Sequence, residues 1–223
     1  MIVEVDQQTP EWLQMRIGMV TASRLIDVVT RLKRKSANGE RGDYAAGRHK
    51  YLMEIVAERL TGRSAEHYVT PYMEAGIENE PLARAAYEIQ TGFDVLPGNF
   101  AIHPQIKWFG ASADALANEG LAEFKCLKVE NHLEILAADA IPLEFIPQMI
   151  GEMACYERPW NDFVSYGAGL PRQLQLYVKR LYRDDAIIAQ FEEEVLAFLE
   201  DVADMLLKLS ASAKPVAVGT EEV

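Results

Sequence analysis

Apolar side chains recur at helical spacing in the N-terminal part of the chain and again near its C-terminus. Thr9 followed by Pro10 predicts a helix start, with Thr as the N-cap and Pro at the first helical position. Three further helices are expected over residues 21–29, 43–60 and 71–91. Because proline lacks a backbone donor, Pro81 is expected to kink the last of these helices or to divide it in two.

The middle of the chain carries strand patterns instead of helical ones. A strand pair is expected over residues 93–102, and a hairpin over residues 108–128 with Asn118 and Gly120 in its turn. The later elements are helices over 129–138 and 143–156, strands over 163–166 and 174–181, and an amphipathic helix from Asp184 to about Leu209. This order of elements predicts an α/β fold, with a mixed central β-sheet flanked by helices.

Length and composition are those of an ordinary soluble protein. The chain has 223 residues, 49% of them hydrophobic and 25% charged, which fits one domain with a substantial core. We expect that domain to cover residues 1–209, followed by a mobile tail over 210–223. The sequence shows no membrane-spanning run, no signal peptide and only two cysteines, so a cytoplasmic location is expected.

Charge is distributed unevenly along the chain, whose formal net charge is −12. Residues 184–223 contain ten acidic residues and two lysines. Residues 31–50 contain two acidic residues and seven basic ones, which are Arg31, Lys33, Arg34, Lys35, Arg41, Arg48 and Lys50. A localised basic segment on an acidic protein fits a confined phosphate-binding surface. An exposed loop with solvated charges is the alternative.

The expected hairpin carries the candidate chemistry. Side chains alternate along a strand, so Glu123 and Lys125 share one face while Phe124 takes the other, and Asp114 arrives from the preceding arm. Two carboxylates bind a hard divalent cation, which can activate water and clamp a scissile phosphate. Lys125 could orient that water or neutralise charge on the phosphate. A solvated salt-bridging face is the alternative for Glu123 and Lys125.

Four stretches carry a resemblance to one nuclease family. The Asp-x8-Glu-x-Lys spacing of the hairpin resembles the PD-(D/E)xK motif. Residues 11–23 contain Trp-x3-Arg-x-Gly followed by Thr-Ala-Ser, residues 72–88 contain Gly-x3-Glu-Pro-x-Ala-Arg, and residues 147–150 place Gln148 on the helix after the hairpin. All four resemble the lambda-exonuclease family of YqaJ-like viral recombinase nucleases, in the same order. The resemblance implies a restriction-endonuclease-like core.

The resemblance also implies roles for particular residues. Asp114, Glu123 and the backbone carbonyl of Phe124 would bind one metal ion, with Glu80 near a second, and Gln148 would orient a phosphate or the attacking water. Arg16 and Ser23 would bind a terminal 5′-phosphate, aided by the Ser112 hydroxyl. The charge of the basic segment, and not the resemblance, suggests that DNA is contacted by Arg31, Lys33, Arg34 and Lys35. Simpler alternatives are a Glu80–Arg84 salt bridge, a surface charge at Arg16, a helix N-cap at Ser23 and a surface side chain at Gln148.

The activity expected from the resemblance is a Mg²⁺-dependent 5′→3′ exonuclease acting on double-stranded DNA ends in a bacterial host. Mn²⁺ should also serve, while Ca²⁺ should support binding without turnover. The product would be a 3′ single-stranded overhang for recombination with a single-strand annealing protein. A ring-shaped homotrimer is expected, with residues 31–50 at the bore and the acidic C-terminal helix outside. Alternatives on the same fold are a structure- or site-specific endonuclease and a catalytically silent DNA-end binding module.

Overall fold

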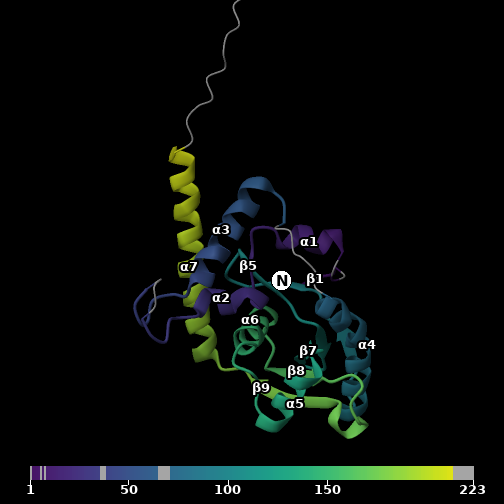
Figure 1. Cartoon of the computed structure of the whole chain (residues 1–223). Coiled ribbons are helices and arrows are strands. Elements are labelled where there is room, and N and C mark those ends of the chain that lie inside the picture. The colour runs from purple at the N-terminus through teal and green to yellow at the C-terminus, as the bar shows by residue number, and fades with distance from the viewer. Residues whose placement is uncertain (1, 6, 8, 36–38, 65–70, 213–223) are drawn as a thin grey trace, which may run out of the picture.

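The computed structural model describes residues 2–5, 7, 9–35, 39–64 and 71–212 of the chain. Most of the expected C-terminal tail, residues 213–223, therefore lies outside the described residues. Two mixed sheets form the framework, and helices flank them (Figure 1). The α/β class expected from the sequence is confirmed, but the expected single central sheet is replaced by two.

The smaller sheet has four short strands in the order β1 (Ile2–Val3), β4 (Phe100–Ile102), β5 (Phe109–Ser112) and β2 (Val20–Thr21). β2 pairs with β5 in parallel, and the other two pairings are antiparallel. This sheet joins the N-terminal segment to the centre of the chain. Strands β1 and β2 were not expected, because runs of two residues are too short to show a period in the sequence.

The larger sheet has five strands in the order β3 (Val95–Pro97), β6 (Ala115–Ala117), β7 (Gly120–Lys125), β8 (Trp160–Tyr166) and β9 (Leu176–Tyr182). Only β7 and β8 are parallel to each other. The hairpin turn lies between β6 and β7, where Asn118 has φ 49° as its residue type allows. All seven residues of β8 are buried, so this strand lies at the centre of the domain.

The chain crosses from one sheet to the other at two neighbouring points. The expected strand pair 93–102 is wrong as a pair, because β3 joins the larger sheet and β4 the smaller one. The first hairpin arm is divided in the same way between β5 and β6, with Asp114 at the crossing. A Cβ at Gly98 would lie 1.8 Å from the carbonyl oxygen of Ala113, so only glycine lets the crossings approach. Gln7 Nε2 donates to the backbone carbonyl oxygens of Gly98 and Ala113, at 3.1 and 2.7 Å.

Helices fill the space around the sheets. They are α1 (Pro10–Arg16), η1 (Ala22–Arg24), α2 (Leu25–Val29), α3 (Ala46–Thr61), α4 (Pro71–Thr91), α5 (Val129–Ala138), α6 (Ile146–Tyr156), η2 (Arg172–Leu174) and α7 (Asp185–Ser212). Thr9 caps α1 as expected, its side chain accepting from the Trp12 amide. Helix α4 continues through Pro81, so the expected division there is wrong. One lost backbone bond is offset by Ala83 and Tyr87, which are fully buried against the larger sheet.

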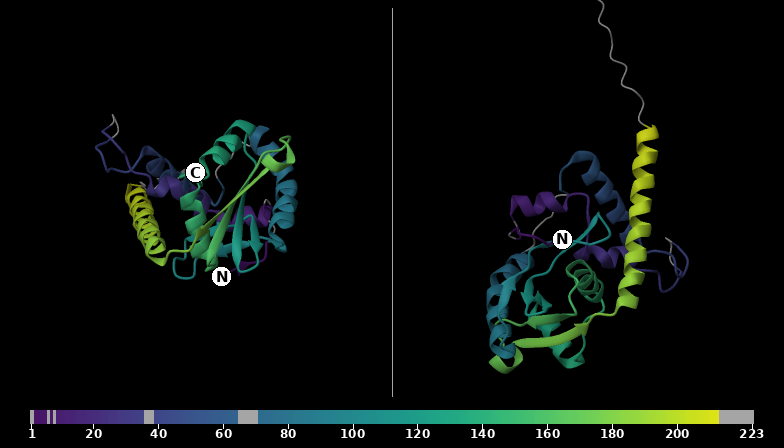
Figure 2. Two further views of the ribbon diagram at one scale, coloured as in Figure 1. Left: turned by 90° about the horizontal axis from the view of Figure 1, so that it is seen from below. Right: turned by 180° about the vertical axis from the view of Figure 1, so that it is seen from behind.

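Helices α4 and α6 cover opposite faces of the larger sheet. Met149 of α6 packs with Phe163 of β8, whereas Tyr87 of α4 packs with the neighbouring residue Val164, which points the other way. Helix α7 packs against α2, α3 and α6 on the side of the molecule away from α4 (Figures 1 and 2). Among the helices that the structure describes, none combines the length and apolar character needed to cross a lipid bilayer.

Candidate active site

The three charged residues expected from the hairpin come together at the start of β6 and along β7. The backbone amide of Phe124 donates to Asp114 Oδ2 at 2.8 Å, which fixes the carboxylate against the strand. Lys125 Nζ donates to Glu123 Oε1 at 2.5 Å, so the two side chains share one face as expected. Phe124 points to the opposite face and packs in the cluster that contains Tyr87. The Glu123 carboxylate is buried, its side chain only 2% exposed.

Helix α6 adds an amide and a third carboxylate to this group. Gln148 Nε2 donates to Glu123 Oε1 at 2.6 Å and to Glu152 Oε1 at 2.8 Å, while its carbonyl oxygen accepts from Lys125 Nζ at 3.3 Å. Gln148 therefore lies within this group of charged side chains and is not an ordinary surface side chain. Glu152 is fully buried, and sequence reasoning missed it. The signal was its position one helical turn after Gln148, on the same face of α6.

Glu80 lies beside the group but is directed to an arginine. Arg84 Nη2 lies 3.4 Å from Glu80 Oε1 and donates to the backbone carbonyl of Asp114 at 3.0 Å. Glu80, Arg84 and Asp114 line a cavity of about 110 Å³. Among the described residues, no cluster of three or more His, Cys, Asp or Glu side chains is gathered closely enough to form a ready metal site. The expected approach of Glu80 to Asp114 and Glu123 stays a prediction.

Burial sets the electrostatics of this site. It raises the pKa of Asp114 well above the ordinary value, and the negative charge of Glu123 adds to the effect. The pKa of Glu152 is raised for the same two reasons. Burial by itself would lower the pKa of Lys125, but the charges of Glu123 and Asp114 outweigh it and raise that pKa. Lys125 is therefore an ammonium cation at neutral pH.

The side chains present fit a divalent cation. Glu123 Oε2 is buried and has no hydrogen-bond partner among the described residues, which leaves one carboxylate oxygen available as a ligand. Asp114 and Glu123 are hard oxygen donors, and the negative charge of Glu123 disfavours the ionised form of Asp114. A cation between them would remove that repulsion.

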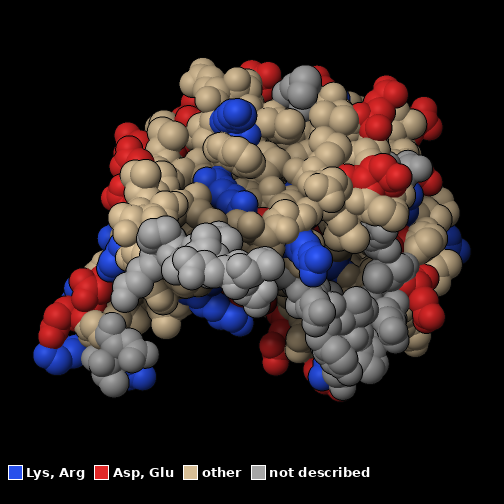
Figure 3. Space-filling model, turned by 90° about the horizontal axis from the view of Figure 1, so that it is seen from above, with Lys and Arg blue, Asp and Glu red and all other residues tan. Residues whose placement is uncertain are grey.

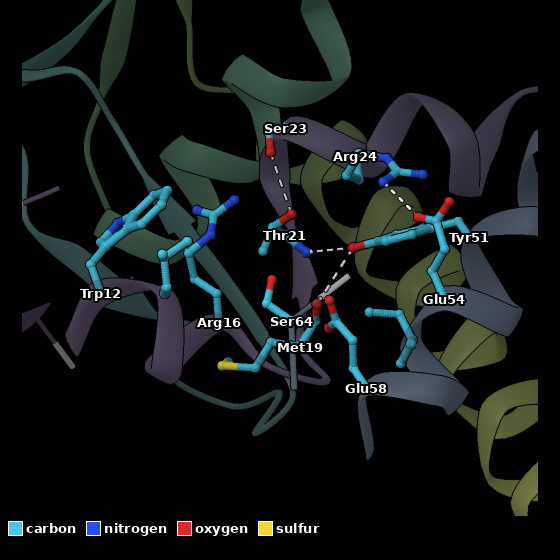
Figure 4. Close-up of a pocket in the computed structure, with 12 residues that line it drawn as sticks. Trp12, Arg16, Met19, Thr21, Ser23, Arg24, Tyr51, Glu54, Glu58 and Ser64 are labelled. Carbon is cyan, nitrogen blue, oxygen red and sulfur yellow. Dashed lines mark hydrogen bonds and ion pairs between the residues drawn. The ribbon is translucent and has the colours of Figure 1, made fainter. Parts of the chain in front are cut away.

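A second candidate site lies between α1, the β2–η1 connection and α3 (Figure 4). This pocket encloses about 230 Å³ and is lined by Arg16, Ser23, Arg24, Trp12, Thr21, Tyr51 and other residues of α1 and α3. Ser23 Oγ lies 3.3 Å from Thr21 Oγ1. Ser23 lies inside η1, and its expected alternative role as an N-cap is not seen, because Thr21 occupies that position. Arg24 is held by Asp27 and Glu54 at 2.7 and 2.8 Å.

Arg16 connects this pocket to β5. Its guanidinium lies over the Trp12 ring at 4.1 Å, and its Nη1 donates to Ser112 Oγ at 3.3 Å. The Trp12 indole nitrogen donates to the same hydroxyl at 2.8 Å. Burial lowers the pKa of Arg16, which remains a cation because the ordinary value is very high. Arg16 is thus a partly desolvated charge facing the pocket, as an anion site requires.

The loop after Arg16 is fixed to α3 through a glycine. Gly18 has φ +70°, its amide donates to Glu58 Oε2 at 2.8 Å, and its carbonyl accepts from Arg59 Nε at 2.8 Å. A Cβ at Gly18 would lie 2.6 Å from Cγ of Arg59. This geometry explains the glycine of the Trp-x3-Arg-x-Gly stretch. It also fixes the direction in which the chain leaves α1 after Arg16.

The basic segment 31–50 lies against α7, whereas the two were expected at separate places. Arg31 pairs with Glu194 at 2.7 Å, and the buried Arg48 pairs with Asp201 at 2.7 Å. Lys35 pairs with Glu40, and Lys33 and Arg34 are exposed. On the face seen in Figure 3, several basic side chains lie nearer the middle and acidic ones along much of the rim. Because Arg48 is buried and paired with Asp201, it supports the fold and is not available to DNA.

Comparisons with known proteins agree with the fold. Residues 11–159 match the YqaJ-like viral recombinase domain. The alkaline exonuclease LHK-Exo from Laribacter hongkongensis, one structure of which is in complex with dAMP, is 40% identical, with a TM-score of 0.82 over 92% of this chain and 97% of that chain. A phage-related exonuclease from Haemophilus somnus 129PT shares the fold, at 16% identity and a TM-score of 0.63 over 86% of this chain and 96% of that chain.

The comparison with curated proteins gave no match. The domain match covers more than half of the chain, and LHK-Exo agrees with it over nearly the full length of both proteins. The chain therefore belongs to the family of YqaJ-like viral recombinase domains.

Proposed function

We propose that this protein is a Mg²⁺-dependent 5′→3′ exonuclease, which digests one strand of linear double-stranded DNA to 5′-mononucleotides and leaves a 3′ overhang. Family membership and the exonuclease named in the structures of LHK-Exo support a nuclease. The single observation that carries the proposal is the contact between Arg16 and Ser112. This contact joins the proposed 5′-phosphate pocket to the end of β5, two residues before Asp114, and so supports the proposal.

The residues divide the chemistry between them. Asp114, Glu123 and the backbone carbonyl of Phe124 would hold the metal ion, with Glu80 beside them. A bound Mg²⁺ or Mn²⁺ supplies an activated water and stabilises charge on the phosphate. Lys125, as an ammonium group, neutralises negative charge that develops during attack. Gln148 contacts both Glu123 and Lys125, so it fixes the relative positions of the ligand and the cation.

The 5′→3′ direction of digestion would come from the pocket at α1. Arg16 offers the donors that its contact with Ser112 leaves over, and Ser23 and Ser112 add hydroxyl groups beside it. Such a set recognises a terminal phosphate dianion better than an internal phosphodiester, which carries one charge less. A 5′-phosphate bound there would place the first phosphodiester of that strand towards Asp114. Exposed Lys33 and Arg34 would contact the duplex electrostatically.

The proposed setting is DNA recombination in the cytoplasm of a bacterial host, encoded by a phage or prophage. A single-strand annealing protein would receive the 3′ strand. Three copies in a ring would keep the enzyme on DNA, because one acidic chain has few basic contacts to retain it. Residues 31–50 would flank the bore, with Lys33 and Arg34 as the side chains exposed to it.

The proposed activity is tested on linear and closed circular DNA, each with and without Mg²⁺. An exonuclease degrades the linear molecule only, and only with the metal present. Cutting of closed circles would instead identify a structure- or site-specific endonuclease. A DNA-end binding module would retain linear DNA without cutting it, which would also overturn the proposal. Replacing Mg²⁺ by Ca²⁺ should preserve binding and stop turnover.

A further inference from the structure

We propose that Glu152 is a positioning residue of the active site, which fixes the side-chain amide of Gln148 so that its nitrogen faces Glu123 and its carbonyl faces Lys125. The inference rests on the proposed function, in which Asp114, Glu123 and Lys125 (the carboxylate–lysine group) form the catalytic centre. Glu152 itself touches neither Lys125 nor Asp114 by any hydrogen bond that the described residues show, so it acts through Gln148.

The hydrogen bonds of Gln148 define the orientation. A side-chain amide has two N–H donors, and here Nε2 donates to Glu123 Oε1 at 2.6 Å and to Glu152 Oε1 at 2.8 Å. With both donors used, Gln148 Oε1 faces Lys125 Nζ at 3.3 Å. A flipped amide would set its carbonyl oxygen against two carboxylates and its N–H groups against an ammonium group. All three contacts would then be repulsive, so two acceptors on the nitrogen side determine one orientation.

Removal of the Glu152 acceptor would leave one N–H of the half-buried Gln148 without its partner. Glu123 alone could then retain the amide through a single bond, and rotation about the last side-chain torsion would be less restricted. Lys125 and Glu123 would lose a fixed neighbour. Supporting contacts of this kind around a metal site change metal affinity or activity by about 10- to 100-fold.

Glu152 is itself held from the sheet. Asn161 of β8, which is fully buried, donates from Nδ2 to Glu152 Oε2 at 2.7 Å. Its own carbonyl oxygen, Oδ1, has no hydrogen-bond partner among the described residues. If an amide replaced the Glu152 carboxylate, Asn161 could turn over and accept from it. The substitution Glu152→Gln would therefore retain an oxygen for Gln148 and remove only the negative charge.

This difference allows geometry to be separated from charge. Glu152→Met keeps the size of the side chain and removes the acceptor, whereas Glu152→Gln keeps an acceptor. If Glu152 positions Gln148, we expect Glu152→Met to lower kcat by about tenfold or more, and Glu152→Gln to stay within about threefold of the wild type. In a Gln148→Ala background, Glu152→Met should then cause little further loss. Equal losses in the two Glu152 variants, or additive losses with Gln148→Ala, would overturn the proposal.

Calorimetric titration with Mn²⁺ in the absence of DNA gives a readout that does not depend on turnover. Glu152→Met should weaken Mn²⁺ binding by about tenfold, and Glu152→Gln should not. If the wild type binds Mn²⁺ but cuts no DNA, the proposed exonuclease function fails while this comparison still decides the role of Glu152. Unchanged Mn²⁺ affinity in folded Glu152→Met would reject the positioning role.

Thermal unfolding controls for loss of structure. Cys155→Ala is the matched control, since Cys155 lies on the same helix, is buried, and makes no contact with the Gln148 network among the described hydrogen bonds. It should lower the melting temperature without changing kcat. If Glu152→Met does not fold, Asn161→Ala replaces it, because it frees the far end of the Glu152 carboxylate. Asn161→Ala should lower kcat in the same direction by a smaller factor, and an unchanged kcat would contradict the proposal.

Discussion

Arg16 donates to the hydroxyl of Ser112 at 3.3 Å, although 96 residues separate them in the chain. Ser112 ends β5, and Asp114 follows two residues later at the crossing between the sheets. The Arg16 pocket and the carboxylate–lysine group are therefore connected through the short backbone segment from Ser112 to Asp114. A ligand that moves Arg16 would act directly on the segment that carries Asp114.

The carboxylate–lysine group gives the first prediction. Asp114→Asn, Glu123→Gln and Lys125→Ala should each lower the rate of DNA digestion by at least about 10²-fold, the scale for loss of one catalytic group. Single-turnover digestion of a linear duplex measures the effect. DNA-end binding should survive in Lys125→Ala, because this residue lies among carboxylates and away from the Arg16 pocket. Near-normal digestion by a variant would remove that residue from the site.

The Arg16 pocket gives a prediction about substrate ends. Linear DNA with a 5′-phosphate should be digested much faster than DNA with a 5′-hydroxyl, because only the phosphate dianion uses the arginine charge. Arg16→Ala should abolish this preference, and Ser112→Ala should reduce it. Parallel time courses on the two substrates measure the ratio. Arg172→Ala, an exposed arginine of η2, serves as the control. Equal rates on both substrates with the wild type would disprove a 5′-phosphate site.

Gly18 allows a comparison of two glycines with similar φ angles. Gly18 has φ +70° and a Cβ there would collide with Arg59, whereas Gly62 has φ +65° and open space around it. Gly62→Ala should therefore cost only the backbone strain, about 1 kcal/mol of unfolding free energy. Gly18→Ala should cost at least about 1 kcal/mol more, in the range of overpacking. Urea denaturation measures both, and equal losses would show that Arg59 moves aside freely.

The pH dependence of stability tests a histidine outside the active site. His103 Nδ1 accepts from the amides of Gln105 and Ile106, so Nε2 donates to Glu192 Oε1 at 3.0 Å. Burial lowers the pKa of His103 despite the opposing effect of Glu192. The unfolded chain therefore takes up this proton at a higher pH than the folded one. The contribution to stability is complete above the unfolded pKa of about 6.5 and is lost as pH falls through the folded value.

His103→Gln should accordingly flatten the loss of unfolding free energy between pH 7.5 and pH 5.5. Urea denaturation at the two pH values gives the difference, and His49→Gln, an exposed residue of α3, is the control. The explanation fails if the wild type and His103→Gln lose equal stability over this interval.

Assembly gives the last prediction. Light scattering should give about three times the chain mass of 25.0 kDa, and digestion of long linear DNA should be processive. Arg34→Ala should weaken DNA retention as salt rises, whereas Arg48→Ala should lower stability because Arg48 is buried against α7. A monomer at micromolar concentration that remains processive would contradict the ring.

The sequence by itself determined the local features of this protein. The 3.6-residue period placed α3, α5 and α7, and the Thr9-Pro10 pair placed the start of α1. The family resemblance indicated Gln148, and alternation on β7 put Glu123 and Lys125 on one face. The helix positions and the shared strand face follow from backbone geometry over a few residues, which the pattern of apolar and polar positions shows directly.

Only the tertiary structure decided the rest. The division into two sheets at Asp114 depends on the contact of Gly98 with Ala113, which no local period reveals. Continuity of α4 through Pro81 depends on the burial of Tyr87 beneath it. Glu152 became part of the site because α6 packs against β7 and β8 and removes its carboxylate from water. Long-range packing determines which charges are desolvated and which partners they find, and that information lies in the fold and not in the spacing of residues.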